Sequence, residues 1–279
     1  MLKLKIECLD LDETLDCGQC FRWNKDENGY WVGVIEDRVV KLKKEQDTLY
    51  VSSNKEENLE KIIKEYLDLE RDYGNIEKEV SKIDSNVEKA ISLTSGIRLL
   101  NQPKFETIIS FIISANNNIP RITKSIDLIS SKYGEKVLLD NKEYYLFPTR
   151  ESLLKASIED LRELGVGFRD KYIYNTTRLL ENEEYFSNIS KLDNENLKKE
   201  LMKLSGVGPK VADCIMLFSF GRKDSFPIDT WIKKIMQKLY YNNIEIPNAK
   251  ILLDSYERYG KNSGIVQQHL FQAVRKGLI

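Results

Sequence analysis

A lysine and an aspartate, each at the start of an expected helix, are the residues of this sequence best placed to do chemistry. Lys210 follows the segment 204–209, and Asp229 lies within the segment 226–231. A lysine amine is a nucleophile once it has lost its proton, and a carboxylate stabilises a developing positive charge. Two such groups facing one cleft would support nucleophilic catalysis. Each also has a simpler interpretation, since a lysine can be a solvated phosphate contact and an aspartate a helix cap.

The segment before Lys210 predicts a tight turn between two helices. Gly206 and Gly208 flank a valine, which favours backbone conformations that residues with a Cβ avoid. Pro209 suits the first position of a helix, and a preceding helix is expected at 194–203. The free amides at the new helix start favour an anion such as a phosphate of a nucleic-acid backbone, and Gly206, Gly208 and Val211 are the candidate phosphate contacts. The alternative is a turn that only connects two core helices.

The composition indicates a globular protein with no general affinity for polyanions. The chain has 279 residues, 41% of them hydrophobic, and its 43 Lys and Arg against 44 Asp and Glu give a net charge of −1. Any nucleic-acid binding must therefore use a local patch. No run of eighteen apolar residues occurs, so we expect no membrane span.

Four cysteines are too few for a secreted disulfide scaffold, and no N-terminal signal segment is evident. We therefore expect a reducing cytoplasm. Cys17 and Cys20 have a metal-like spacing, but there is no second pair, and the one histidine, His269, is distant in sequence. We predict no metal site. The remaining cysteines are Cys8 and Cys214.

The order of expected elements predicts an α+β fold. Alternating apolar and polar residues with turn signals indicate antiparallel strands over residues 1–53, whereas from Lys55 the period is helical and remains so to the C-terminus. We expect an N-terminal antiparallel sheet with a flanking helix, residues 1–85. We expect it to pack on a mainly α-helical body, residues 86–279, that contains the helix-hairpin-helix.

The motif Leu-x-Gly-Val-Gly-x-Lys-Val-Ala-Asp-Cys, followed by Pro-Ile-Asp-Thr-Trp, resembles the helix-hairpin-helix DNA glycosylases, and its Lys-Val-Ala-Asp-Cys form is similar to that of 8-oxoguanine DNA glycosylases. The resemblance extends from Gly18 to Phe271, and the chain lacks the clustered cysteines of the iron–sulfur members. It implies a bifunctional DNA glycosylase and AP lyase of base-excision repair. Lys210 would attack C1′ of the flipped nucleotide, form a Schiff base and allow β-elimination, while Asp229 would stabilise positive charge on the sugar.

The resemblance also implies a pocket for the flipped base. Gly18, within Gly-Gln-x-Phe-Arg-Trp, would accept the N7 proton that distinguishes 8-oxoguanine from guanine. Gln267 would bind the Watson–Crick edge, Phe271 would stack on the base, and Cys214 would close the opposite face. On helical spacing alone, Gln267 and Phe271 would be rim and core residues. His269 falls between them and is expected to point elsewhere.

Two further segments correspond to contacts at the lesion. Residues 114–121 read as a loop between helices because asparagines favour turns and caps. The resemblance implies that Asn116 fills the space left by the flipped base and that Arg121 contacts the unpaired cytosine. In the second Gly-Val-Gly corner, Phe168 would be the wedge, where the family pattern has tyrosine, and Arg169 a second cytosine contact.

The resemblance implies duplex DNA with 8-oxoguanine, preferably opposite cytosine, as the partner of a monomeric, cytoplasmic protein of prokaryotic type acting on nucleoid DNA. No cofactor or catalytic metal is expected, and a structural monovalent cation at the hairpin is a feature of some relatives. Two alternatives remain. One is an alkylpurine DNA glycosylase that uses Asp229 with water, and the other is a noncatalytic helix-hairpin-helix module that binds DNA.

Overall fold

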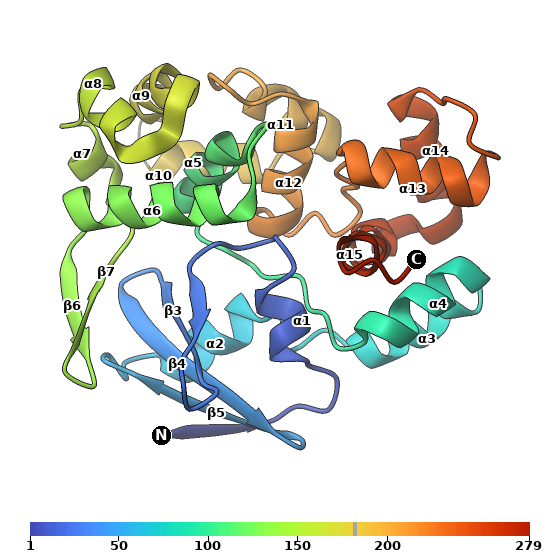
Figure 1. Ribbon diagram of the computed structural model, residues 1–279, viewed down its shortest axis with the longest axis horizontal. Coiled ribbons are helices and arrows are strands. Elements are labelled where there is room, and N and C mark those ends of the chain that lie inside the picture. Colours follow the sequence, from blue (N-terminus) through green and yellow to red (C-terminus); the bar gives the residue numbers. More distant parts are fainter. Residues whose placement is uncertain (181–182) are drawn as a thin grey trace.

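A computed structural model describes residues 1–180 and 183–279, in which a small antiparallel sheet lies against a helical body (Figure 1). Its five strands pair in the order β1-β5-β4-β3-β2, and all neighbours are antiparallel. The strands are β1 (Leu2–Lys5), β2 (Trp23–Lys25), β3 (Trp31–Ile35), β4 (Arg38–Glu45) and β5 (Thr48–Ser53).

Local turn chemistry explains the meander. The Asp26 side chain accepts the amides of Asn28 and Tyr30, each at 2.9 Å, and Gly29 has a φ of +78° in the β2–β3 turn. An aspartate that bonds amides ahead of it mimics a turn, and glycine tolerates positive φ. The segment 26–29 is therefore one of the turn signals that separate the strands expected over residues 1–53.

Helices make up the remainder of the chain. They are α1 (Leu11–Leu15), α2 (Leu59–Tyr66), α3 (Tyr73–Ser81), α4 (Ser85–Thr94), α5 (Lys104–Ser114), α6 (Ile119–Tyr133), α7 (Arg150–Leu153), α8 (Ile158–Leu161), α9 (Asp170–Leu179), α10 (Glu183–Ser190), α11 (Asn194–Leu201), α12 (Pro209–Ser219), α13 (Thr230–Tyr240), α14 (Asn248–Tyr259) and α15 (Ser263–Arg275). Short π and 3₁₀ turns join α8 to α9 and α14 to α15.

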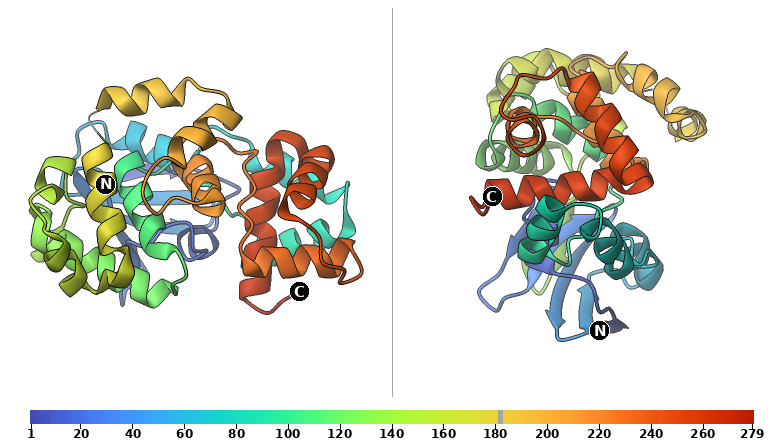
Figure 2. Two further views of the ribbon diagram at one scale, coloured as in Figure 1. Left: turned by 90° about the horizontal axis from the view of Figure 1, so that it is seen from above. Right: turned by 90° about the vertical axis from the view of Figure 1, so that its right-hand side faces the viewer.

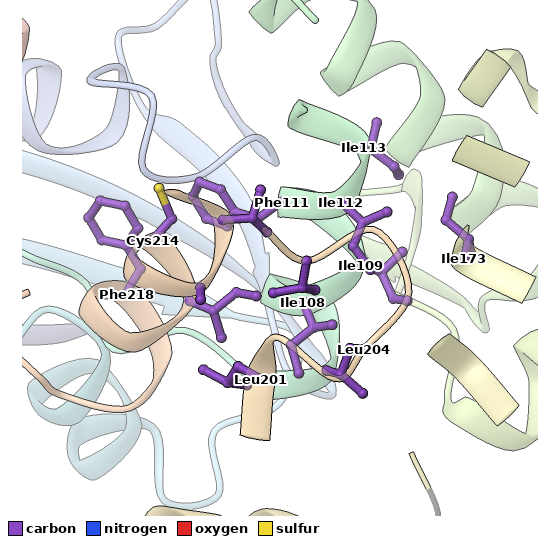
Figure 3. Packing of buried hydrophobic residues seen from close by; sticks show 14 of the residues in the cluster. Ile108, Ile109, Phe111, Ile112, Ile113, Ile173, Leu201, Leu204, Cys214 and Phe218 are labelled. Atoms are coloured by element: carbon purple, nitrogen blue, oxygen red, sulfur yellow. The ribbon is translucent and has the colours of Figure 1, made fainter. Parts of the chain in front are cut away.

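Helix α5 is the centre of the helical body. Every residue from Thr107 to Ile113 is buried, as expected of a helix that is apolar on all sides. Its neighbour α12 is buried from Val211 to Ser219, and the two helices interlock through residues such as Phe111 and Phe218, whose rings stack at 5.5 Å (Figure 3). The start of α12, which carries Lys210, is thereby fixed to the core.

Two expectations about the elements were wrong. The region 1–53 contains the helix α1, which Asp10 caps by accepting the Glu13 amide at 2.9 Å. The region beyond Lys55 is not helical throughout, because β6 (Lys136–Leu139) and β7 (Lys142–Tyr145) form a hairpin. Its turn residues, Asp140 and Asn141, both have positive φ, which is the hairpin signal that helical periodicity concealed.

This hairpin is a separate two-stranded sheet that covers one face of the five-stranded sheet. All five residues of β3 are buried, because Trp31 and Ile35 face the cluster under α1 and α2 while Val32 and Val34 face the β6–β7 hairpin. A strand covered on both faces loses the alternation expected of a half-exposed one.

The C-terminal helix α15 packs against helices from both the first and the last third of the chain. Helices α3 and α4 pack beside α15, below α13 and α14 in Figure 1 and at the right in the left view of Figure 2. Residues of α4, α13, α14 and α15 share one apolar cluster. Within the described ranges, no helix is both long and apolar enough to cross a membrane.

Candidate active site

The turn between α11 and α12 has the conformation of a helix-hairpin-helix. Gly206 has a φ of +85°, and a Cβ there would lie 2.8 Å from the Tyr172 side chain, so only glycine fits. The prediction that Gly208 also needs a glycine-only conformation was wrong. Its φ of −89° and ψ of 179° are extended backbone that any residue can adopt. A Cβ on Gly208 would meet nothing within 4 Å, which leaves open space beside the helix start.

Helix α12 begins as predicted, with Gly208 as N-cap and Pro209 in the first turn. The Lys210 Nζ lies 5.6 Å from the centroid of the Phe111 ring of α5. The Phe111 ring also packs edge-on against the Phe21 ring, with centroids 5.6 Å apart. These two rings connect Lys210 to the segment that contains Gly18. Sequence reasoning missed Phe111, because a phenylalanine in an apolar helix gives no functional signal.

Cys214 lies one turn beyond Lys210 and is buried. Burial raises the pKa of the Cys214 thiol to about 11, while the Lys210 charge lowers it and the charges of Asp213 and Asp229 raise it further. The thiol is therefore neutral and apolar at ordinary pH. Lys210 and Asp229 are thus both near enough to Cys214 for their charges to act on its thiol.

Asp229 caps α13, as predicted, by accepting the Ile232 amide at 2.7 Å. The side chain remains partly exposed, so the carboxylate that caps the helix is also accessible from the surface. Two residues earlier, the Pro227 carbonyl accepts the Gln267 Nε2 at 3.2 Å. The cap of α13 and the predicted base pocket on α15 are thus directly connected.

The structure brings Gly18 and Phe271 together from opposite ends of the chain. Gly18 has a φ of +78°, and a Cβ there would lie 3.3 Å from the Phe271 ring. Gln267 is buried, and its Oε1 has no hydrogen-bond partner among the described residues. The Gln268 Nε2 donates to the Cys17 carbonyl at 2.8 Å, which fixes the Gly18 segment on α15.

Gln19 holds this segment from the other side. Its buried amide donates to the carbonyls of Thr14 and Arg98 at 2.8 Å and accepts the Leu100 amide at 2.9 Å. Its backbone carbonyl accepts Gln102 Nε2 at 2.7 Å. Since all these partners belong to the protein, Gln19 positions Gly18 without facing a ligand itself.

The three consecutive asparagines each have a separate structural role. Asn116 is exposed with a φ of +52°, Asn117 donates to the Ile113 carbonyl at 3.0 Å, and Asn118 caps α6 by accepting the Arg121 amide at 3.1 Å. The predicted loop between helices is confirmed. Asn116 and Arg121 are both exposed, and so free to meet DNA.

The corner before α9 presents one exposed and one buried residue. The Phe168 side chain is 59% exposed, whereas Arg169 is only 6% exposed. The Arg169 guanidinium donates to the carbonyls of Ala115 at 2.9 Å, Asn116 at 2.9 Å and Val166 at 3.0 Å. In this conformation Arg169 organises the Asn116 loop, and contact with a cytosine would require it to exchange these carbonyls for the base.

His269 points away from the predicted pocket, as expected, with Nδ1 2.8 Å from the Thr94 hydroxyl of α4. Cys17 and Cys20 are buried, and their thiols donate to the carbonyls of Thr14 and Leu15. Across residues 1–180 and 183–279, no group of three or more His, Cys, Asp or Glu side chains could hold a metal ion.

The chain thus combines a helix-hairpin-helix whose second helix carries Lys210 with an aspartate that caps the next helix, and its family match assigns it to the base excision DNA repair proteins. Residues 1–108 match the N-terminal domain of 8-oxoguanine DNA glycosylases, and residues 109–256 match the HhH-GPD superfamily of base excision DNA repair proteins. The division between these two matches differs from the expected boundary at residue 85, which stays a prediction.

Individual relatives agree with the two matches. N-glycosylase/DNA lyase OGG1 of Arabidopsis thaliana is 31% identical over 98% of this chain and 79% of its own length. "Probable N-glycosylase/DNA lyase" of Methanothermobacter thermautotrophicus is 30% identical over 100% of this chain and 97% of its own length. The Clostridium acetobutylicum 8-oxoguanine glycosylase/lyase, solved with duplex DNA containing cytosine opposite 8-oxoguanine, superposes with a TM-score of 0.92 at 39% identity, covering 100% of this chain and 99% of that one. The chain therefore belongs to the 8-oxoguanine DNA glycosylase/lyase family.

Proposed function

We propose that this protein excises 8-oxoguanine from duplex DNA and then cleaves the strand at the resulting abasic site. The observation that carries the assignment is the contact of Gly18 with Phe271, one turn along α15 from the buried Gln267. The buried Gln267 Oε1 accepts no hydrogen bond from any residue that the structure describes, and the Watson–Crick edge of guanine offers N–H donors to such an acceptor. The Gly18 segment adds a backbone carbonyl, which suits the N7 proton of the oxidised base and would repel the N7 lone pair of guanine.

Base flipping precedes chemistry, because C1′ and the lesion are inaccessible in a stacked duplex. Unstacking and unpairing cost about a few kcal/mol. Asn116 and Phe168 are exposed on neighbouring loops and would offset this cost by filling the vacated space. The hairpin, through Gly206, Gly208 and Val211, would hold a phosphate, and the open surface at Gly208 supports this role.

In the reaction, the neutral Lys210 amine attacks C1′ and the glycosidic bond breaks, with its electron pair leaving on the base. Asp229 stabilises the positive charge that develops on the sugar during this step. Ring opening then gives a Schiff base at C1′, and loss of a C2′ proton expels the 3′ phosphate by β-elimination. Cys214 and Phe271 would enclose the base from its two faces, and the neutral thiol is compatible with stacking.

The partner strand supplies specificity. Arg121 is exposed beside Asn116 and would donate to the acceptors of an unpaired cytosine, and Arg169 would join it after leaving the loop carbonyls. We further propose that the protein acts as a monomer on nucleoid DNA in the cytoplasm.

No cofactor is needed in this scheme, because Lys210 is itself the nucleophile. A structural monovalent cation at the hairpin is a separate proposal. There the Leu204 carbonyl already accepts the Val207 amide at 3.1 Å and the Ser205 carbonyl accepts the Thr176 hydroxyl at 2.9 Å. Such an ion would have to share these oxygens or use the other carbonyls of the turn.

Borohydride trapping on a duplex with 8-oxoguanine opposite cytosine tests the proposal. The unmodified protein should form a covalent adduct that maps to Lys210, and Lys210→Gln should abolish the adduct and strand cleavage while retaining lesion binding. Lys203→Gln is the matched control, since Lys203 is an exposed partner of Glu200 close to the same hairpin. An adduct at another lysine, or no excision of 8-oxoguanine, would overturn the proposal.

A further inference from the structure

The corner before α9 and the hairpin before α12 are in contact through one side chain. The Tyr172 ring packs edge-on against Phe168 with centroids 6.2 Å apart and an interplanar angle of 86°. The Tyr172 side chain also lies against the Gly206 backbone so closely that a Cβ on Gly206 would be 2.8 Å from it. Neither Phe168 nor Gly206 can move toward Tyr172 without displacing the Tyr172 ring.

A second contact makes α9 a rigid connection. The buried Thr176 hydroxyl, one turn beyond Tyr172, donates to the Ser205 carbonyl at 2.9 Å. At the other end of the helix, Arg169 binds the carbonyls of Ala115 and Asn116. Helix α9 therefore touches the Asn116 loop, the Phe168 corner and the hairpin within two of its turns.

We propose that Tyr172 is a positioning residue that couples insertion of Phe168 at the opposite base to the placement of the hairpin, and through α12 to the placement of Lys210. The inference rests on the proposed function, since it concerns how that site is aligned. In this view, a partner base that lets Phe168 insert fully presses the Tyr172 ring onto Gly206 and sets the start of α12. A partner base that blocks insertion leaves the hairpin less well placed, so discrimination reaches the chemical step.

The contacts identify the ring, not the hydroxyl, as the coupling element. Tyr172→Phe keeps both contacts and should leave single-turnover excision nearly unchanged. Tyr172→Leu fills space beside Gly206 without presenting a ring to Phe168. Tyr172→Ala removes the ring from both contacts and leaves only the Cβ beside Gly206. Both should lower excision opposite cytosine and reduce the ratio of the rates opposite cytosine and adenine. Tyr174→Ala is the matched control, because Tyr174 is a half-buried tyrosine on α9 that packs under Arg178.

The decisive experiment is a double-mutant cycle of Phe168→Ala and Tyr172→Ala. The effects of substituting two residues that contact each other are not independent. The excision rate of the double variant should therefore fall roughly 2- to 10-fold less than the product of the two single-variant reductions. The cycle is read both from excision and from 2-aminopurine fluorescence opposite a stable abasic-site analogue, which reports insertion of Phe168 without any chemistry.

Each outcome has a distinct meaning. Multiplicative losses in both readouts, or a Tyr174→Ala effect equal to that of Tyr172→Ala, would overturn the coupling. An unmodified protein that leaves 8-oxoguanine in place would defeat the proposed function, whereas the fluorescence cycle would still decide the coupling. Should Tyr172→Ala fail to fold, Tyr172→Leu takes its place in the cycle with the same expectations.

Discussion

Replacement of His269 tests whether a buried imidazole sets the acid limit of the helix that carries the base pocket. The ring is fully buried on α15, between Gln267 and Phe271 in sequence. The Thr94 hydroxyl donates to the Ala90 carbonyl at 2.8 Å, so its oxygen accepts the hydrogen bond that the His269 Nδ1–H donates at 2.8 Å. Because burial lowers the pKa of the imidazole, the ring is neutral and its one proton is on Nδ1.

The size of the effect follows from the pKa. Burial lowers the pKa of His269 from 6.5 to about 4, so the unfolded chain binds a proton at a pH where the folded protein does not. Stability from the neutral ring is complete above pH 6.5 and is lost as the pH falls toward 4. Between pH 8 and pH 5 the loss is about 2 kcal/mol. The Glu77 carboxylate, 3.7 Å from Nε2, favours the protonated ring, so this figure is an upper bound.

Urea unfolding of the unmodified protein and of His269→Gln at pH 8 and pH 5 measures this loss. Glutamine is neutral at both values and its amide can donate to Thr94, so the difference in unfolding free energy between the two proteins should narrow by up to about 2 kcal/mol at pH 5. In the protein that retains His269, Glu77→Gln should make the unfolding free energy depend more strongly on pH, because it removes the carboxylate that favours the protonated ring. A difference between the two proteins that is independent of pH would refute the assignment of a neutral buried histidine.

Asp229→Asn should lower excision at least about 100-fold with little change in DNA affinity, since the carboxylate acts on charge in the transition state; unchanged single-turnover rates would leave Asp229 as a cap only. Phe271→Ala should weaken binding of lesion-containing duplex by about 1–3 kcal/mol, and Gln267→Ala should reduce discrimination against undamaged guanine. Competition binding measures both effects. Unchanged affinity and discrimination in the double variant would place the pocket elsewhere. Excision opposite cytosine should exceed that opposite adenine, and Arg121→Ala should diminish the preference; Arg169→Ala should in addition disturb the loop that it holds. Equal rates opposite both bases in the unmodified protein would contradict this proposal.

Much of the local structure could be predicted from the sequence. Gly206, Pro209 and Asp229 act through their own backbone or through amides three residues away, and such preferences depend little on the rest of the protein. The order of sheet and helices was likewise accessible, because burial imposes its period on each element. The β6–β7 hairpin escaped prediction because its strands are short and only its Asp140–Asn141 turn carries a local signal.

The unpredicted features of the site are long-range contacts. Gln19 reads as a polar residue in a loop, yet its side chain bonds backbone groups of Thr14 and of the distant segment 98–100 and fixes Gly18 beside them. Phe111 reads as core, yet its ring is the neighbour of the Lys210 amine. Helical periodicity assigns Phe111 to structure alone, since it records which face is buried and not what lies against that face.

The base pocket shows why these contacts matter for function. Its residues come from opposite ends of the chain, and the Gln268 to Cys17 hydrogen bond, the Gln267 to Pro227 hydrogen bond and the packing of Gly18 on Phe271 all meet on α15. A displacement of α15 would therefore alter the Gly18 carbonyl, the pocket acceptor and the approach to Asp229 together. In the proposed mechanism, recognition of the base and alignment of Asp229 are therefore coupled, because α15 contacts both the Gly18 segment and the segment that precedes Asp229.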